Sequence, residues 1–199
     1  MALELAQTYK EMMKSGEFRR LEHSSPWPHF VVDGLLPITS FTKVQSQILA
    51  SSPNYTIAED HPAKIQLDHL PDLALTEFFF GDEMRGFLEG LSGKALRPNE
   101  EIAIQIRRMT DDSPEFPPHI DLIEKPSLIA LYYVAPGWQD GGGGELVLLK
   151  NEDGGEEKAV APLENRLVLF WTGDQYWHMV RRVKNWTRLM VLTEWLIEE

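Results

Sequence analysis

Three residues have side chains suited to binding one metal ion: His119, Asp121 and His178. His119 and Asp121 are two positions apart in the stretch 116–121, and side chains at this spacing on a β-strand point to the same face. His178 lies far downstream, at the start of another predicted strand. Two imidazoles and one carboxylate leave other positions on an ion open, as iron(II) requires to bind a bidentate cosubstrate and dioxygen. The same donors suit zinc or manganese. Alternatively, His119 and Asp121 lie in a loop and bind no metal.

Arg188 could provide the positive charge of an anion site beside this metal site. It follows His178 in the same predicted hairpin region, and a buried guanidinium requires an anionic partner. A ligand carboxylate is one candidate partner, and Glu194 or another surface acid is the alternative. Upstream, Gln105 and Arg107 share one face of a predicted strand. If that face points into the barrel, Arg107 could bind a substrate carboxylate; otherwise it is solvated.

Three further features near these residues are open to two interpretations. The run Gly141–Gly144 lacks the lysine and the helix of a phosphate-binding loop, which favours a hairpin turn with close backbone approach. Trp171 and Trp177 could line a substrate pocket or fill the sheet interior. The segment Thr110–Phe116 leads into the metal motif, so substrate contacts are expected there first.

The composition excludes several classes of function. The chain has 199 residues, a net charge of −12 and no cysteine, which rules out disulfides, thiolate ligands and a cysteine nucleophile. The negative charge disfavours nucleic-acid binding through a general basic surface. No apolar run is long enough for a transmembrane helix, and Met1–Gln7 does not resemble a signal peptide, so we expect a cytoplasmic protein.

The N-terminal part shows mainly helical periodicity. Apolar residues recur at helical spacing in three segments, at about residues 3–14, 38–50 and 71–91. Gly81 is expected to divide the third segment in two. Residues 30–32 predict a short strand, and the polar stretch 51–70 predicts a loop with one short strand.

After Gly93 the apolar pattern changes to alternation, which is typical of strands. Strands are predicted around residues 102–106, 128–134, 145–149, 159–161, 166–171, 179–183 and 189–197, with turn residues between them. Several short strands at this spacing predict an antiparallel sandwich or barrel, with the N-terminal helices covering one outer sheet face.

The order of these motifs resembles that of the iron(II)- and 2-oxoglutarate-dependent dioxygenases of the prolyl-hydroxylase-like group. The resemblance extends through about residues 102–197, and Pro28–Leu36 also looks like the helical preface of bacterial members. The motifs that carry it are His119–Asp121, Leu131–Trp138, Gly143–Leu146, Pro162, Asn165–Trp171, His178–Val180 and Arg188. It implies an α+β, mainly β fold: a double-stranded β-helix (jelly roll) with N-terminal helices packed on one sheet. Residues 1–199 would form a single domain, with a helical preface at 1–95 and the catalytic core at 96–199.

The resemblance also implies roles for individual residues. Arg188 would bind the distal carboxylate of 2-oxoglutarate, and Tyr133 matches a tyrosine that helps to hold it. Alternation allows only one of Tyr132 and Tyr133 to point inward, and the family's register favours Tyr133. A carboxylate at position 121 argues for hydroxylation, because halogenating members carry a small residue there. The iron ligands would be His119, Asp121 and His178. Independently of the resemblance, the candidate substrate contacts are Arg107 and Trp171.

The predicted function is therefore hydroxylation of an unactivated carbon in a prolyl or other amino-acid-like substrate, with release of succinate and CO2. The implied cofactors are Fe(II), 2-oxoglutarate and O2, with ascorbate in addition. The alternatives are a non-catalytic jelly-roll binding protein, a hydroxylase of a non-amino-acid small molecule, and a zinc hydrolase on a related barrel. The expected partner is a peptide or small-molecule substrate, with no nucleic acid and no membrane.

Overall fold

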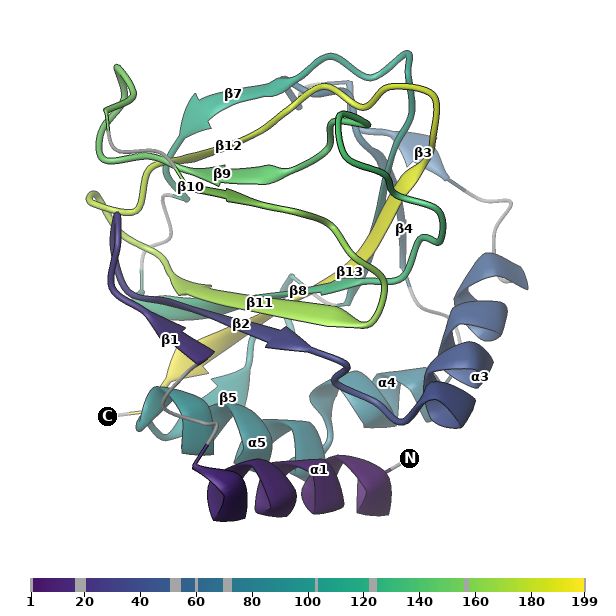
Figure 1. The fold of residues 1–199 in the computed structure, drawn as a ribbon, viewed down its shortest axis with the longest axis vertical. Coiled ribbons are helices and arrows are strands. Elements are labelled where there is room, and N and C mark those ends of the chain that lie inside the picture. The colour runs from purple at the N-terminus through teal and green to yellow at the C-terminus, as the bar shows by residue number, and fades with distance from the viewer. Residues whose placement is uncertain are drawn as a thin grey trace.

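Two antiparallel β-sheets face each other, and the helices lie against the outer face of the larger sheet (Figure 1). The computed structural model describes residues 2–16, 21–50, 55–59, 61–69, 73–102, 104–121, 125–155 and 158–198. Over these residues the larger sheet has the order β1-β2-β11-β8-β13-β6-β4-β3, with β5 beside β13, and the smaller has the order β10-β9-β12-β7. This arrangement confirms a mainly β fold with N-terminal helices covering one sheet. None of the described helices is long and apolar enough to cross a membrane.

The helices form where the apolar periodicity predicts them. Their bounds are α1 Ala2–Ser15, α3 Ile38–Ala50, α4 Leu73–Phe80 and α5 Asp82–Ser92. Gly81 has extended backbone angles and separates α4 from α5, as predicted. A Cβ atom at Gly81 would lie 2.1 Å from the carbonyl oxygen of Glu77, so this break requires glycine. Gly93 ends α5 in the left-handed conformation, and its N–H donates to the carbonyl oxygen of Glu89.

The strands of the larger sheet divide their side chains between two hydrophobic cores. Along β13, Leu189, Val191 and Trp195 pack toward the helices, whereas Met190 and Leu192 point between the two sheets. The strands of this sheet are β1 Glu22–His23, β2 His29–Asp33, β3 Thr56–Ile57, β4 Gln66–His69, β5 Leu96–Pro98, β6 Gln105–Met109, β8 Ser127–Tyr133, β11 Arg166–Trp171 and β13 Arg188–Ile197. The smaller sheet contains β7 Phe116–His119, β9 Leu146–Leu148, β10 Lys158–Val160 and β12 His178–Val180.

Several details of the strand prediction are wrong. The stretch 51–70 contains two short strands, β3 and β4, rather than one, and β1 and β5 were not predicted. The strand expected from Ile102 begins only at Gln105. Ile102 lies in a turn in which its N–H donates to the carbonyl oxygen of Asn99, while the Asn99 side chain accepts from the N–H of Glu101. Such side-chain-to-backbone bonds compete with strand pairing, which explains why the alternation of apolar residues starts earlier than the strand.

Asn165 fixes the connection that leads into β11. It adopts a left-handed conformation, with φ of 60°, and is buried. Its side-chain oxygen accepts bonds from the N–H of Leu36 and the hydroxyl of Tyr132, and its amide donates to the carbonyl oxygen of Leu36. Tyr132 therefore points toward the helices and has a structural partner, which leaves the opposite face of β8 to Tyr133.

His29 on β2 is fully buried, and its ionisation should make the stability of the protein depend on pH. Its Nδ1–H donates to the carbonyl oxygen of Trp27, while Nε2 has no partner among the described residues. Burial is the main reason why its pKa is lowered from 6.5 to about 4, with smaller contributions from Lys158 and His23; the Trp27 carbonyl opposes them.

Acidification is therefore expected to destabilise the metal-free protein through His29. The unfolded chain binds a proton near pH 6.5 but the folded protein only near pH 4, so this contribution to stability is lost as the pH falls between these values. Between pH 7 and 5 the loss should be about 2 kcal/mol. Urea unfolding of wild type and His29→Phe at both pH values measures it. A His29→Phe variant with the same pH dependence as wild type would contradict this prediction.

Candidate functional site

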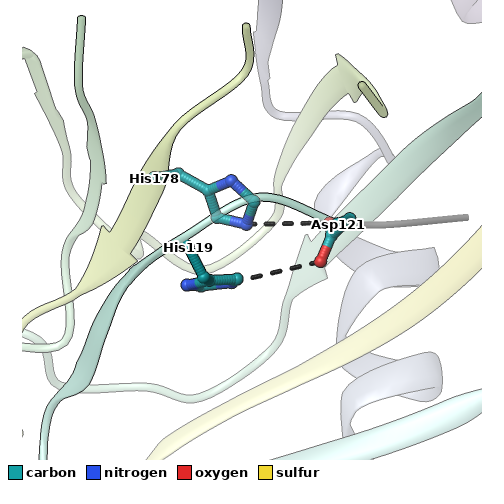
Figure 2. A group of neighbouring side chains, drawn as sticks. All are labelled: His119, Asp121 and His178. Carbon is teal, nitrogen blue, oxygen red and sulfur yellow. Dashed lines mark ion pairs between the residues drawn. The ribbon is translucent and has the colours of Figure 1, made fainter. Parts of the chain in front are cut away.

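The two histidines come from paired strands of the smaller sheet. β7 and β12 are antiparallel, and His119 on β7 lies directly opposite His178 on β12. Asp121 lies two residues beyond the end of β7, where the chain turns back toward both histidines (Figure 2). The prediction that His119 and Asp121 share one strand face is therefore wrong in detail, because the strand ends at His119.

The three side chains converge on one point. Asp121 Oδ1 is 4.0 Å from His119 Nε2, and Asp121 Oδ2 is 3.6 Å from His178 Nε2 (Figure 2). Each residue offers one donor atom, and these three atoms lie within 4.8 Å of one another. An ion bound by nitrogen and oxygen at about 2 Å fits between donors at this separation. The geometry is that of two imidazoles and one carboxylate on one side of a metal, with the other side open.

Backbone contacts orient both imidazoles for metal binding. Nδ1 of His119 is 2.7 Å from the carbonyl oxygen of Pro117, and Nδ1 of His178 is 2.9 Å from that of Tyr176. A carbonyl can only accept, so Nδ1 carries the proton in each ring and the Nε2 lone pair points to the centre of the site. Burial, followed by the neighbouring His178, lowers the pKa of His119 to about 4. His119 is therefore neutral near pH 7, which is the form that binds metal.

Arg188 lies in the same cavity as the metal-site residues, at the start of β13. Its side chain is only 2% exposed, and no carboxylate of the described residues lies within 4.0 Å of its guanidinium. Glu194 is six residues farther along β13, roughly 20 Å in an extended strand, so it is not the partner of Arg188. We call this space the Arg188 cavity; its apolar wall includes Leu131, Leu146, Phe170 and Met190.

Neutral groups hold the guanidinium of Arg188 in place. Its Nη2 donates to the hydroxyl of Tyr133 at 3.2 Å, and the guanidinium lies over the Tyr133 ring. Its Nε donates to the carbonyl oxygen of Gly144 at 3.0 Å. A Cβ atom at Gly144 would lie 2.9 Å from Trp186 and 3.2 Å from Cδ of Arg188, so this approach requires glycine. The remaining donors of Arg188 can bind an anion in the cavity.

The run Gly141–Gly144 makes the close backbone approach predicted for it, but it is not a hairpin turn. It connects β8 in the larger sheet to β9 in the smaller sheet, and these two strands do not pair. A Cβ atom at Gly143 would lie 1.8 Å from the carbonyl oxygen of Arg182. The glycines therefore allow the chain to cross between the sheets beside Arg188.

A second cavity adjoins the metal site on the side of Arg107. We call it the Glu194 cavity; it contains His61, Arg107, Phe116 and Glu194 together with His119 and Asp121. Arg107 lies opposite Met190 in the pairing of β6 with β13, so it points between the sheets. Arg107 thus points inward, which is the orientation that a contact with substrate requires. Burial lowers the pKa of Arg107 to about 10; the negative charge of Asp121 opposes this shift, and the positive charge of Arg188 adds a smaller lowering. The guanidinium therefore stays charged near pH 7.

The aromatic residues near the site differ from those predicted. Trp171 on β11 lies opposite Leu128 on β8 and packs with the core beneath the helices, an orientation that favours the sheet interior over the predicted substrate contact. Its neighbour Phe170 points between the sheets and lies 4.9 Å from the His178 ring, measured between centroids. Adjacent side chains on a strand point to opposite faces, so when Phe170 points between the sheets, Trp171 points away from them.

Two further aromatic rings lie near His119: Phe116, from the segment expected to contact substrate, and His61, which the sequence did not identify. Phe116 stacks on His119 with ring centroids 3.6 Å apart, and His61 lies 4.3 Å from Phe116. Phe116 ends the predicted substrate segment Thr110–Phe116, and it is the residue of that segment that lines both cavities. The proximity of His61 depends on a loop far away in the sequence, so no local pattern could reveal it.

The chain can now be compared with known proteins. Residues 104–197 match the family model of the 2OG-Fe(II) oxygenase superfamily. No curated protein matches the chain in sequence. A Pseudomonas putida prolyl-4-hydroxylase has a similar structure, with a TM-score of 0.67 and 17% identity over 98% of this chain and 99% of that chain.

Two other solved structures are similar over most of their length. A Trichoplax adhaerens prolyl hydroxylase, in complex with a hypoxia inducible factor oxygen degradation domain peptide fragment, has a TM-score of 0.61 and 16% identity over 98% of this chain and 91% of that chain. HygX from Streptomyces hygroscopicus, with nickel and 2-oxoglutarate bound, has a TM-score of 0.62 and 12% identity over 84% and 82%. At these identities the structural likeness establishes the fold alone.

The part of the chain that matches the family model contains both histidines, Asp121 and Arg188. Residues 104–197 therefore contain a domain of the 2OG-Fe(II) oxygenase superfamily. The protein is a 2-oxoglutarate-dependent dioxygenase, and its cofactors are Fe(II), 2-oxoglutarate and O2. The predicted enzyme class and these three cofactors are thereby confirmed, whereas ascorbate stays a prediction.

Proposed function

We propose that the protein hydroxylates an unactivated carbon of a prolyl or other amino-acid-like substrate. His119, Asp121 and His178 would hold the iron(II), and Arg188 with Tyr133 would bind the distal carboxylate of 2-oxoglutarate. The observation that carries this proposal is the buried, unpaired guanidinium of Arg188 in the same cavity as the three converging metal donors. A buried cation without an anion is costly, so the site suits a ligand that brings a carboxylate.

The cofactors supply the oxidation: one oxygen atom of O2 enters the substrate C–H bond as a hydroxyl, and the other enters succinate as 2-oxoglutarate loses CO2. The four electrons that reduce O2 come in equal parts from the substrate and from 2-oxoglutarate. The protein orients and shields the reacting groups. Arg188 offers a planar pair of donors to a carboxylate, and Tyr133 Oη is placed to donate beside it. Phe116 and Phe170 cover the two histidines with apolar surface and limit the access of water.

We further propose that β6–β13 form a double-stranded β-helix within a single domain of residues 1–199. Along the chain these strands alternate between the two facing sheets, except that β9 and β10 both lie in the smaller one. The alternation supports a jelly roll, since consecutive strands cross from one sheet to the other. The helices of the preface, 1–95, share a core with the larger sheet, which supports one folding unit with the core at 96–199.

The amino-acid-like substrate is proposed on two grounds. Two prolyl hydroxylases are among the similar structures, and one of them was solved with a peptide. In addition, Arg107 places a positive charge beside the metal site, where it could bind a carboxylate. Asp121 supports hydroxylation over halogenation, because it fills the position that halogenating relatives leave to a small residue.

Two measurements test the function. Iron(II)-loaded protein with 2-oxoglutarate under nitrogen should develop a visible charge-transfer band, and in air it should release succinate when a substrate from a library of amino acids and peptides is added. Absence of the band would refute the oxygenase site. A band without succinate release for any library member would favour the alternatives, a binding protein or a hydroxylase of another class of small molecule.

Replacing Tyr133 with phenylalanine should weaken 2-oxoglutarate binding moderately. The variant loses the hydroxyl beside Arg188 but keeps the ring under the guanidinium, so about 1 kcal/mol, or roughly fivefold in the apparent affinity, is expected. The matched control is Tyr132→Phe, whose hydroxyl bonds Asn165 on the helix side. It should lower the free energy of unfolding and leave the 2-oxoglutarate dependence unchanged. Titration of the charge-transfer band measures both variants, and equal effects would contradict the assignment.

A further inference from the structure

The buried carboxylate of Glu194 has one oxygen, Oε1, without a partner among the described residues. Its side chain points between the sheets, since Glu194 lies opposite Ile129 in the pairing of β13 with β8. The residue is 1% exposed. Within the described part of the chain, no donor or cation reaches Oε1, and the side chain forms no ion pair. A buried carboxylate oxygen without a partner needs an explanation, and a cation supplied by a ligand is one.

The carboxylate of Glu194 lines the same cavity as Arg107. Arg107 forms one side-chain hydrogen bond among the described residues, from Nε to Gln105 Oε1 at 2.9 Å, so the other donors of the guanidinium are free for a ligand. Across β6 and β13, Arg107 lies opposite Met190, which is four residues before Glu194 on the same strand face. Four residues of strand correspond to about 13 Å, so the two charged residues stand at separate places in the cavity.

The Glu194 cavity therefore presents one negative and one positive group to a molecule that reaches the metal site. Its volume is about 420 Å³, which is in the range of small-molecule sites. Phe116, Ile129 and Leu192 provide apolar surface between the charged residues. His119 and Asp121 also line this cavity, so a molecule bound there contacts the proposed iron ligands.

We propose that the substrate is a free, zwitterionic amino acid, held by its cationic nitrogen at Glu194 and by its carboxylate at Arg107. This inference rests on the proposed function and deepens it, because it separates a free amino acid from a residue within a polypeptide. A residue inside a peptide has neutral amides in place of the two charged groups, so it would leave the buried Glu194 carboxylate without a cation. Charge-assisted hydrogen bonds at both ends would select the free molecule.

Binding to the wild-type protein tests this inference without any variant. The protein is loaded with iron(II) and 2-oxoglutarate under nitrogen and titrated calorimetrically with the twenty free amino acids. Each is compared with its fully N-acetylated derivative, its carboxamide and a peptide with blocked ends that contains it. At least one free amino acid should bind ten times more tightly than its three derivatives. Equal or tighter binding of the blocked peptides would overturn the inference.

Two variants test which residue recognises the amino group and which recognises the carboxylate of the substrate. Glu194→Gln should abolish the discrimination against the N-acetylated derivative and keep that against the carboxamide, and Arg107→Gln should do the reverse. The matched controls are Glu198→Gln, which is exposed just beyond the end of β13, and Arg108→Gln, which lies beside Tyr55. Both controls should keep both selectivities. A Glu194→Gln variant that still discriminates as wild type does would overturn the role of Glu194.

The failure of this inference is distinct from failure of the proposed function. The charge-transfer band of iron(II) and 2-oxoglutarate forms without substrate, so its absence refutes the oxygenase site itself. If the band forms in wild type and in Glu194→Gln but no free amino acid is preferred, the oxygenase site stands and the zwitterionic substrate is refuted.

Discussion

Replacing Asp121 with alanine is expected to weaken iron(II) binding by more than about a hundredfold and to abolish succinate formation, because loss of a group that only supports a ligand already costs about ten- to a hundredfold. Asp121 is the one carboxylate among the three converging donors, and it lies within 4.0 Å of both imidazole Nε2 atoms. Without it, two imidazoles remain as donors. Anaerobic titration with iron(II), followed by the charge-transfer band and by metal content after dialysis, measures the loss.

Two variants make the Asp121 result specific. Asp112→Ala removes an exposed carboxylate in the turn between β6 and β7, and it should bind iron as wild type does. Asp121→Glu keeps the charge but moves the carboxylate, and it should retain part of the binding. Iron affinity of Asp121→Ala equal to that of wild type would mean that the metal binds elsewhere.

The sequence predicted the elements whose periodicity extends over several residues. The helices α1, α3, α4 and α5 follow the apolar spacing closely, and the break at Gly81 lies where predicted. The strands β3 and β5 have two and three residues, too few to show alternation. Such strands form because a longer neighbour offers free backbone groups, which is a tertiary effect that local sequence does not carry.

The metal donors could be predicted because each is a chemically distinctive residue near a strand end. His119 and His178 lie opposite each other on paired strands. The sequence predicted the two strands but not that they pair with each other. The placement of Asp121 depends on the segment after β7, so strand alternation alone does not explain why Asp121 lies beside the two histidines. The burial of Arg188 in the cavity, away from the described carboxylates, could not be read from its position in the sequence.

The residues that the sequence misjudged depend on which face of a strand points inward. Trp171 and Phe170 are adjacent and both aromatic, and the pairing of β11 with β8 decides that Phe170 faces the cavity. For Tyr132 and Tyr133 the family register predicted the phase that the structure shows. Glu194 was considered only as a partner for Arg188, because its distance along β13 and its burial are visible only in the folded chain.

Replacing Arg188 with alanine is expected to raise the 2-oxoglutarate concentration for half-maximal activity by roughly a hundredfold or more, since truncating one partner of a buried charge pair costs about 2–5 kcal/mol. Arg107 also lines the Arg188 cavity, but Arg188 is the guanidinium that lies over Tyr133, beside apolar side chains such as Leu131 and Met190. Without it, the carboxylate would lose the guanidinium that Tyr133 and Gly144 hold in place. Succinate release measured over a range of 2-oxoglutarate concentrations gives the change.

The Arg188→Ala variant should keep iron binding, because none of the three metal donors contacts Arg188 through a hydrogen bond. At saturating 2-oxoglutarate its turnover should fall much less than its affinity, as expected for a group that binds the far end of the cosubstrate and not the reacting end. Arg188→Lys restores the charge without the planar pair of donors, so its affinity should lie between those of wild type and Arg188→Ala. If Arg188→Ala loses iron and 2-oxoglutarate together, the residue supports the fold of the site, and if neither changes, the distal carboxylate binds elsewhere.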